Sequence, residues 1–169
     1  MHHHIGNLFE IYEAKTLEVI QEQKSNPNDV INIIMHGCNA QGKMGSGFAK
    51  ELRSRFPGAY DVYEETFDAV GLTLGDTVFY VDEAEGSSTI IANCITQDRY
   101  GYDGKKYVSY DGIDLCMTRL NDMIPKLSDN VHLHFPTLGA DLGGGNWEVI
   151  RAIIDTRITN ATKHLYTLK

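Results

Sequence analysis

The sequence predicts a single α/β domain in which helices flank a mixed β-sheet. Short apolar runs rich in β-branched residues alternate with longer segments of helical periodicity. Two of the apolar runs are separated by only a few residues, which predicts one antiparallel hairpin. The 169 residues contain no repeat or linker that would divide them, so we predict one domain over residues 1–169.

The first predicted strand is open to two interpretations. The opening Met-His-His-His is either a truncated purification tag or the start of a native strand that leads into Ile5-Gly6-Asn7-Leu8, and we favour the strand. The later strands are predicted at residues 30–36, 76–82, 88–95, 131–135 and 164–168. Of these, 76–82 and 88–95 form the predicted hairpin.

Helical periodicity starts at residues 9–24, and Ser-Asn-Pro-Asn-Asp ends that helix. Phe48, Leu52 and Phe56 recur at helical spacing before Pro57, which predicts a helix from Gly47 onward. Further helices are predicted at 58–68 and 109–124, and after Asn146, a good N-cap residue.

Composition excludes several classes of partner. A net charge of -8 argues against non-specific binding to nucleic acids or membranes, because both are polyanionic. Cys38, Cys94 and Cys116 have neither disulfide-framework nor zinc spacing, which favours a reducing, cytoplasmic compartment. No apolar run reaches the roughly 18 residues of a membrane span.

Two glycine-bearing loops, at 37–47 and 137–146, join strands to helices. Ligands of open α/β sheets bind beyond the carboxyl ends of strands, where helix N-termini and free N–H groups favour anions. The pair of loops therefore predicts a ligand that carries a diphosphate. Neither loop is a P-loop or a dinucleotide fingerprint, because residues 42–47 lack the following Lys-Ser/Thr and the G-x-G-x-x-G spacing.

Four segments resemble the macro domain family, whose members are ADP-ribose-binding modules. They are Gly6-Asn7-Leu8, "IIMHGCNAQGKMGSGFA", "NCITQDRYG" and "FPTLGADLGGGNWEVI". The resemblance implies a three-layer α/β/α macro-domain sandwich with a central mixed β-sheet, and residues 11–28 as a helical insertion. It implies ligand contacts from Asn7, Leu8, Asn39, Met44, Gly45, Ser46, Gly47, Phe48, Thr96, Gln97, Pro136, Thr137, Leu138, Gly139, Ala140, Leu142, Gly143, Gly144, Gly145 and Asn146.

The chain looks most similar to the branch that holds ADP-ribose 1''-phosphate phosphatases and terminal ADP-ribose glycohydrolases. Two positions depart from the glycohydrolases: Gln97 stands where they have a lysine, and Gly143 where they have an acid. Lysine-centred covalent chemistry is therefore absent at Gln97. The resemblance implies ADP-ribose binding with hydrolysis at the distal ribose, or else a non-catalytic reader or nucleotide sponge. It implies no metal or cofactor, a monomer, and ADP-ribose or ADP-ribosylated macromolecules as partners.

Three residues are catalytic candidates, each with a structural alternative. Asn39 either contacts ribose hydroxyls or fixes its own turn. Asp141, the only carboxylate of the second loop, is a general acid or base or an ordinary surface acid. His36 titrates near neutral pH as a free side chain, yet at a strand end it is equally a hydrogen-bonded scaffold residue.

The remaining candidates are interpreted structurally. Lys43 is a solvated loop lysine or a phosphate contact. His132 and His134 share one strand face, as in some metal sites, but no third ligand lies nearby in sequence, so packing or exposure is favoured. Cys38 is expected to be a small buried residue rather than a nucleophile.

Overall fold

The computed structural model describes residues 1–22, 30–84, 89–140 and 142–168. Within these residues the strands are β1 (His2–Ile5), β2 (Ile31–Asn39), β3 (Thr77–Val81), β4 (Thr89–Gln97), β5 (Val131–Phe135) and β6 (Thr162–Thr167). The helices of the described residues are α1 (Leu8–Glu22), α2 (Gly47–Arg55), α3 (Pro57–Val70), α4 (Tyr110–Leu127) and α5 (Trp147–Arg157). None of these helices is long and apolar enough to cross a membrane.

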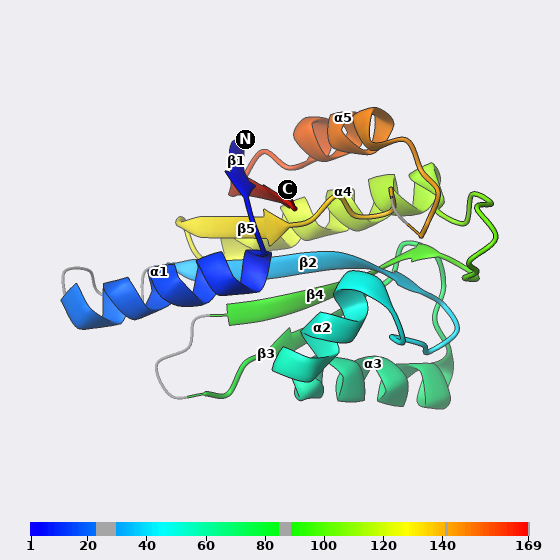
Figure 1. The fold of residues 1–169 in the computed structure, drawn as a ribbon, viewed down its shortest axis with the longest axis horizontal. Coiled ribbons are helices and arrows are strands. Elements are labelled where there is room, and N and C mark those ends of the chain that lie inside the picture. Colours follow the sequence, from blue (N-terminus) through cyan, green and yellow to red (C-terminus); the bar gives the residue numbers. More distant parts are fainter. Residues whose placement is uncertain (23–29, 85–88, 141, 169) are drawn as a thin grey trace.

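The strands form one mixed sheet in the order β1-β6-β5-β2-β4-β3. The pair β3 and β4 is antiparallel and the other neighbouring strands are parallel, so the predicted hairpin and mixed sheet are confirmed. Because β2, β4 and β5 run in the same direction, their carboxyl ends meet at one edge of the sheet (Figure 1). Both glycine-bearing loops leave from this edge.

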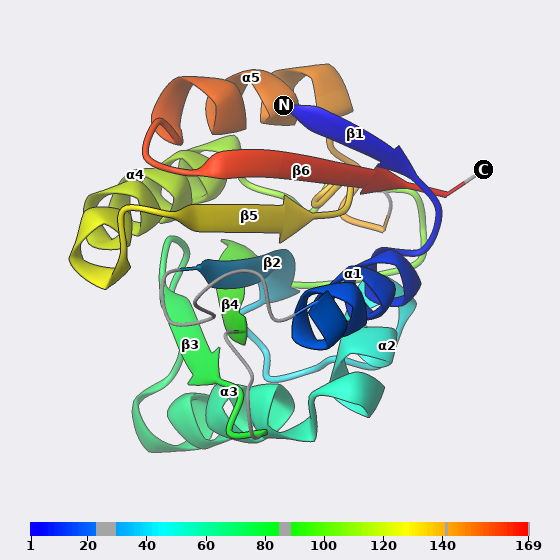
Figure 2. The same ribbon diagram turned by 90° about the vertical axis from the view of Figure 1, so that its left-hand side faces the viewer.

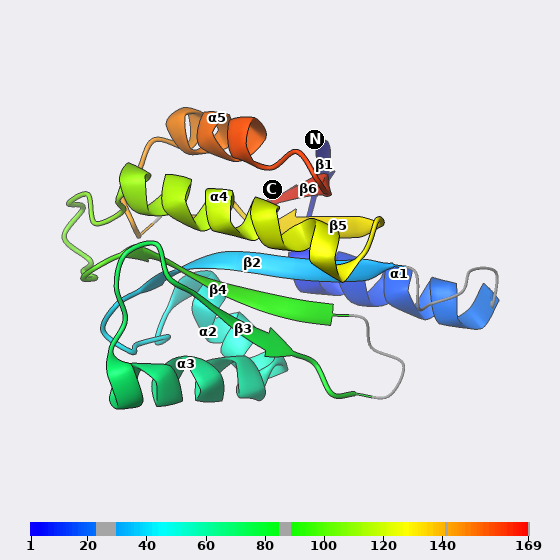
Figure 3. The ribbon, with the colours of Figure 1, turned by 180° about the vertical axis from the view of Figure 1, so that it is seen from behind.

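Helices cover both faces of the sheet (Figure 2). Side chains of β2 alternate between these faces, as expected for a strand buried on both sides. Ile33 and Met35 pack with the buried residues of α4 and α5, whereas Ile34 packs with those of α1 and α2. Figure 3 shows α4 and α5 on the face opposite to α1 and α2. The predicted three-layer sandwich is confirmed.

The two ends of the chain meet at one edge of the sheet. β1 pairs with β6 in parallel, from His2 opposite His164 to Ile5 opposite Thr167, so the expected first strand is confirmed. Asn7 then starts α1, because its Oδ1 accepts from the backbone N–H groups of Phe9 and Glu10. The predicted stop at 25–29 and part of the predicted 11–28 insertion lie outside the described residues.

Some predicted boundaries were wrong. β2 continues from residue 36 to Asn39 because it keeps pairing with β4, up to Asn39 opposite Gln97. His36 and Cys38 therefore lie on the strand, and the first loop is shorter than the predicted 37–47. α4 also passes Pro125 and ends at Leu127. A proline in the last turn removes one N–H without breaking the turns before it.

Candidate functional site

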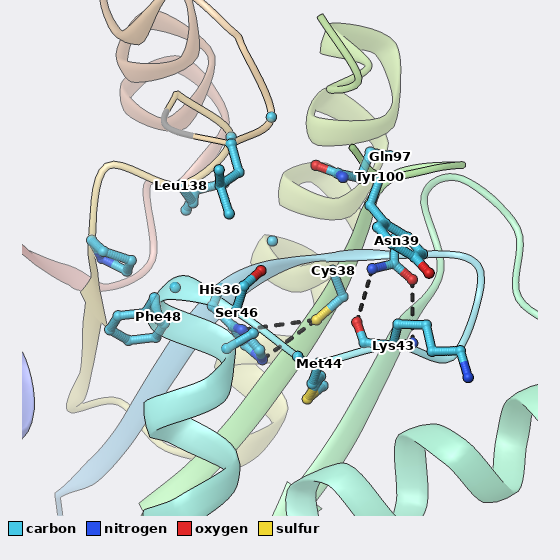
Figure 4. Close-up of a pocket in the computed structure, with 18 of the residues that line it drawn as sticks. His36, Cys38, Asn39, Lys43, Met44, Ser46, Phe48, Gln97, Tyr100 and Leu138 are labelled. Carbon is cyan, nitrogen blue, oxygen red and sulfur yellow. Dashed lines mark hydrogen bonds between the residues drawn. The ribbon is translucent and has the colours of Figure 1, made fainter. Parts of the chain in front are cut away.

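A pocket of about 420 Å³ opens at the carboxyl edge of the sheet (Figure 4). The end of β2 and residues 43–49 form one wall, and residues 136–139 with 142–143 form the facing wall. Residues 97 and 100–102, which follow β4, line it as well. Both predicted ligand loops thus border one cavity, as expected for strand ends that share an edge.

Most of the predicted ligand contacts line this pocket. They are Asn39, Met44, Gly45, Ser46, Gly47, Phe48, Gln97, Pro136, Thr137, Leu138, Gly139, Leu142 and Gly143, together with the catalytic candidate His36. Asp141 lies outside the described residues.

Other predicted contacts do not line the pocket: Asn7, Leu8, Thr96, Ala140, Gly144, Gly145 and Asn146. Asn7 caps α1, and its Nδ2 donates to the Glu51 carboxylate at 3.0 Å. Leu8 is buried in the core, and Asn146 caps α5 by accepting from the N–H of Glu148. These contacts explain the placement of the residues within the protein itself, and a ligand role for them stays a prediction.

Thr96 is buried directly beneath the pocket. A Cβ at Gly37, which lines the pocket floor, would lie only 2.7 Å from Thr96 Oγ1. Among the described residues, no group forms a hydrogen bond with this hydroxyl. Glycine is therefore required at position 37 for the strand to lie over Thr96.

The Asn39 side chain organises the first loop. Its Nδ2 donates to the carbonyl of Lys43 at 2.8 Å (Figure 4), and its Oδ1 accepts from the N–H of Gln41 at 3.0 Å. The buried hydroxyl of Tyr63 also donates to Asn39, at 2.6 Å to its carbonyl and 3.0 Å to Oδ1. The structure thus supports the turn-fixing alternative for Asn39, and contact with a ribose stays a prediction.

His36 lies on the pocket floor with only 2% of its surface exposed. Its Nε2 is 2.6 Å from Oδ1 of Asn93, whose Nδ2 donates to the carbonyl of Ala59. Since that oxygen can only accept, Nε2 carries the proton and Nδ1 is the acceptor nitrogen of the ring. Burial lowers the pKa of His36 to about 4, although the bond to Asn93 acts in the opposite direction. His36 is therefore neutral at pH 7.

Cys38 lies beside His36 on the same face of β2. Its Sγ is 3.4 Å from His36 Nε2 and 3.8 Å from Nδ1 (Figure 4). Burial raises the pKa of the Cys38 thiol well above its usual value. The thiol is 3% exposed, so the expectation of a small buried cysteine is confirmed.

The second loop is held by backbone contacts. The carbonyl of Gly143 accepts from the N–H groups of Tyr107 and Val108, and the carbonyl of Gly139 accepts from the N–H of Gly145. Gly139 has φ of 76°, a conformation that side chains other than glycine rarely adopt. The conformation of the second loop is therefore fixed by hydrogen bonds to the carbonyl groups of Gly139 and Gly143.

The pocket is electropositive within an acidic protein. Lys43 and Arg53 line it, and among its described lining residues there is no Asp or Glu. The Arg53 guanidinium stacks at 3.7 Å over the ring of Tyr60. A chain of net charge -8 thus places two cations beside this pocket.

Several lining residues were not singled out by the sequence prediction, among them Arg53, Tyr60, Gly101 and Tyr102. Arg53 and Tyr60 lie on α2 and α3, beyond the glycine-bearing loops that guided the prediction. Gly101 and Tyr102 lie in the loop after β4, where the Tyr-Gly-Tyr repeat was an available signal. Whether these residues line the pocket depends on how α2 and this loop pack at the edge of the sheet, which the sequence does not show.

His132 and His134 lie away from the pocket, in a cluster of stacked rings with His164 of β6. His134 is 6% exposed and contacts the Tyr166 hydroxyl through Nδ1 at 2.8 Å, so the packing interpretation is confirmed for it. In the part of the chain that the structure describes, no three His, Cys, Asp or Glu side chains are grouped to hold a metal ion.

Comparison with known proteins decides the family. No protein-family model matches the chain. An uncharacterised 17.5 kDa protein from the tk-vs intergenic region of Enterobacteria phage T4 is 30% identical over 124 residues, which are 73% of this chain and 77% of the phage protein. The ADP-ribose 1''-phosphate phosphatase of Debaryomyces hansenii is 26% identical over 149 residues, 74% of this chain and 82% of that enzyme.

Solved structures agree with these relatives. A macrodomain protein from Streptomyces coelicolor is 26% identical with a TM-score of 0.66, over 81% of this chain and 88% of its own. The macrodomain of Thermus aquaticus DarG has a TM-score of 0.71 at 19% identity, over 98% of this chain and 97% of its own. The chain belongs to the macro domain family. Thermosipho africanus DarTG, solved in complex with ADP-ribose, matches this macro domain with a TM-score of 0.67 at 22% identity, over 82% of this chain and 38% of its own.

Proposed function

We propose that this macro domain binds ADP-ribose in the pocket at the carboxyl edge of the sheet, and that it hydrolyses a bond at the distal ribose. The bond is that of a 1''-phosphate, or of an ADP-ribosyl or acyl ester. One observation carries the proposal: both glycine-bearing loops wall a single pocket that has two cations and, among its described residues, no carboxylate. The name of the Debaryomyces relative and the ligand of the DarTG structure support it.

Binding would rest on backbone donors and local charge. The first turn of α2 borders the pocket through Gly47, Phe48 and Ala49, and a helix N-terminus attracts anions. Gly45 leaves room there, because a Cβ at this position would meet nothing within 4 Å. Lys43 and Arg53 would add charge for a ligand with two or more phosphates.

Hydrolysis would rest on holding the ribose and a water in place. His36 is neutral at pH 7 and, through Nδ1, can accept but not donate a hydrogen bond. Gln97 has no amine for a covalent intermediate, and its Nε2 donates to the carbonyl of Arg99 at 2.7 Å. The chain's contribution would therefore be orientation and electrostatic stabilisation from fixed N–H groups.

A second candidate function is a reader that binds ADP-ribose without cleaving it. The contacts of Asn39 favour it, because this side chain is engaged by its own loop and by Tyr63. The absence of a lysine at Gln97 and of an acid at Gly143 favours it too.

Two measurements separate these functions. Calorimetric titration with ADP-ribose tests binding, with adenine and ribose 5-phosphate as weaker-binding controls. Phosphate release from ADP-ribose 1''-phosphate, and release of ADP-ribose from an ADP-ribosyl ester, test hydrolysis. No heat of binding and no thermal shift at millimolar ADP-ribose would refute the whole proposal. Binding without turnover of either substrate would leave the reader.

A further inference from the structure

Ser46 occupies the N-cap of α2 but does not cap the helix. Its backbone has φ of -153° and ψ of 164°, the extended conformation of an N-cap residue, and serine is among the preferred residues there. Even so, its side chain accepts no hydrogen bond from the first turn. By contrast, Ser109 caps α4 by accepting from Gly112, and Asn146 caps α5 by accepting from Glu148. The sequence and backbone of Ser46 favour a cap that the side chain does not make.

The Ser46 hydroxyl is used by Tyr102 instead. The Tyr102 hydroxyl donates to Ser46 Oγ at 3.0 Å, and both residues line the pocket. Tyr102 lies in the loop after β4, so this bond joins that loop to the start of α2. The same loop is fixed close by, because the Tyr107 hydroxyl and the N–H of Lys105 both donate to Asp103. The bond therefore engages the Ser46 hydroxyl with a residue outside its own helix.

The first turn of α2 is left open to the pocket as a result. The N–H groups at the start of a helix have no partner within the helix, and they carry its positive dipole. Gly47, Phe48 and Ala49 line the pocket, and no side chain of the described residues caps their N–H groups. A Ser46 cap would occupy one of these donors.

We propose that Tyr102 is a positioning residue: it holds Ser46 off the N-terminus of α2 and so keeps that terminus free for an anionic group of the ligand. This inference rests on the proposed ADP-ribose binding. If the inference is right, loss of the Tyr102 hydroxyl raises the stability of the free protein but lowers its affinity for the ligand. Loss of a residue that only supports the loop would lower both. Without that hydroxyl, Ser46 caps α2 and stabilises the free protein, and the ligand's anion then competes with the cap.

The test compares Tyr102→Phe, Ser46→Ala and the double variant by thermal unfolding without ligand and by calorimetric titration with ADP-ribose. We expect Tyr102→Phe to raise the Tm of the free protein by a few degrees, since a cap contributes about 1 kcal/mol. We expect its Kd for ADP-ribose to rise roughly three- to tenfold. In the Ser46→Ala background, Tyr102→Phe should raise neither the Tm nor the Kd, because no side chain remains to cap.

Tyr107→Phe is the matched control, since it removes a tyrosine hydroxyl from the same loop whose partner is Asp103 rather than Ser46. It should not raise the Tm. A Tyr102→Phe variant that loses both Tm and affinity, or keeps both unchanged, overturns the inference. If the wild-type protein does not bind ADP-ribose, the proposed function is overturned, and so is the claim that Tyr102 keeps the helix N-terminus free for a ligand. The Tm values of the variants then test only whether Tyr102 prevents Ser46 from capping α2.

Discussion

Gln97 and Gly143 are neighbours across the pocket, although they lie 46 positions apart in the chain. A Cβ at position 143 would lie 3.1 Å from Gln97 Oε1. It would also lie 2.7 Å from the carbonyl oxygen of Gly139, which is too close for any side chain without movement of the loop. The two positions that depart from the glycohydrolase pattern therefore lie next to each other in the pocket. The backbone around position 143 leaves room for glycine but not for a larger residue.

Gln97→Lys should be tolerated, because Gln97 is partly exposed and loses one hydrogen bond, to the carbonyl of Arg99. Stability should change by no more than about 1 kcal/mol. The new amine would stand in the pocket, and cleavage of an ADP-ribosyl ester is the activity to assay. A large loss of stability in urea unfolding would contradict this placement of Gln97.

Gly143→Asp should not act as the simple complement of Gln97→Lys. Its Cβ meets the Gly139 carbonyl, so the second loop must shift, and we expect a loss of stability of about 1–3 kcal/mol. Gly143→Ala separates the two effects, because it adds the Cβ without the carboxylate. Equal losses in both variants would identify the backbone contact as the cause, whereas an unaffected alanine variant would disprove it.

Gly45→Val should weaken ADP-ribose binding at least tenfold with little change in stability. A Cβ at Gly45, which lines the pocket, meets nothing within 4 Å, and the φ of Gly45 is not in the left-handed region, so the new side chain occupies open space beside the pocket without strain. The sequence alone suggests the same test at Gly47. However, Gly47 has φ of 60°, where a β-branched residue is strained, so Gly47→Val also destabilises the fold. Titration and thermal unfolding of both variants check this difference, and unchanged binding by Gly45→Val would contradict the pocket assignment.

Stability should fall as the pH drops from 7 to 5. Burial lowers the pKa of His36 and His164 to about 4 and that of His134 to about 2, whereas an unfolded histidine has a pKa near 6.5. Between these values the unfolded chain binds protons that the folded chain does not, so acid favours unfolding. For a side chain as buried as His36, the loss reaches roughly 2 kcal/mol by pH 5.

Urea unfolding at pH 7.5, 6 and 5 measures this loss, and His36→Gln tests the assignment, since it should reduce the pH dependence by one proton. Stability that does not change over this range would contradict the burial of these histidines. The wider cluster should contribute as well, because His164 stacks on both His132 and His134 and their charges would repel.

The sequence predicted the sheet and its loops well because periodicity and glycine placement are local signals. The apolar, β-branched run at residues 30–36 was enough to predict a buried strand, and in the structure Ile33, Ile34 and Met35 are buried on its two faces. The positions of side chains within the pocket were harder to predict. Asn39 and Ser46 are both polar loop residues, yet the bonds that define them come from Tyr63 and Tyr102, which lie 24 and 56 residues away. Such long-range contacts leave no periodic trace in the sequence.

Asn39→Ala distinguishes a loop organiser from a catalytic residue. Its side chain donates to the Lys43 carbonyl and accepts from the Gln41 N–H and the Tyr63 hydroxyl. Removal leaves buried polar groups unpaired, and we expect a loss of about 1–3 kcal/mol in the free energy of unfolding. Because the first loop is then released, ADP-ribose affinity should fall too.

Turnover then decides the role of Asn39. If this side chain only shapes the loop, kcat/KM should fall by the same factor as the affinity, and kcat should stay nearly constant. If it also orients the ribose or a water in the transition state, kcat itself should fall further. Asn39→Asp is a second variant, since it keeps the acceptor for Gln41 but replaces the donor to the Lys43 carbonyl with a negatively charged acceptor. The contacts in the structure favour the first outcome, and a kcat loss of 10²-fold or more in a folded Asn39→Ala variant would contradict it.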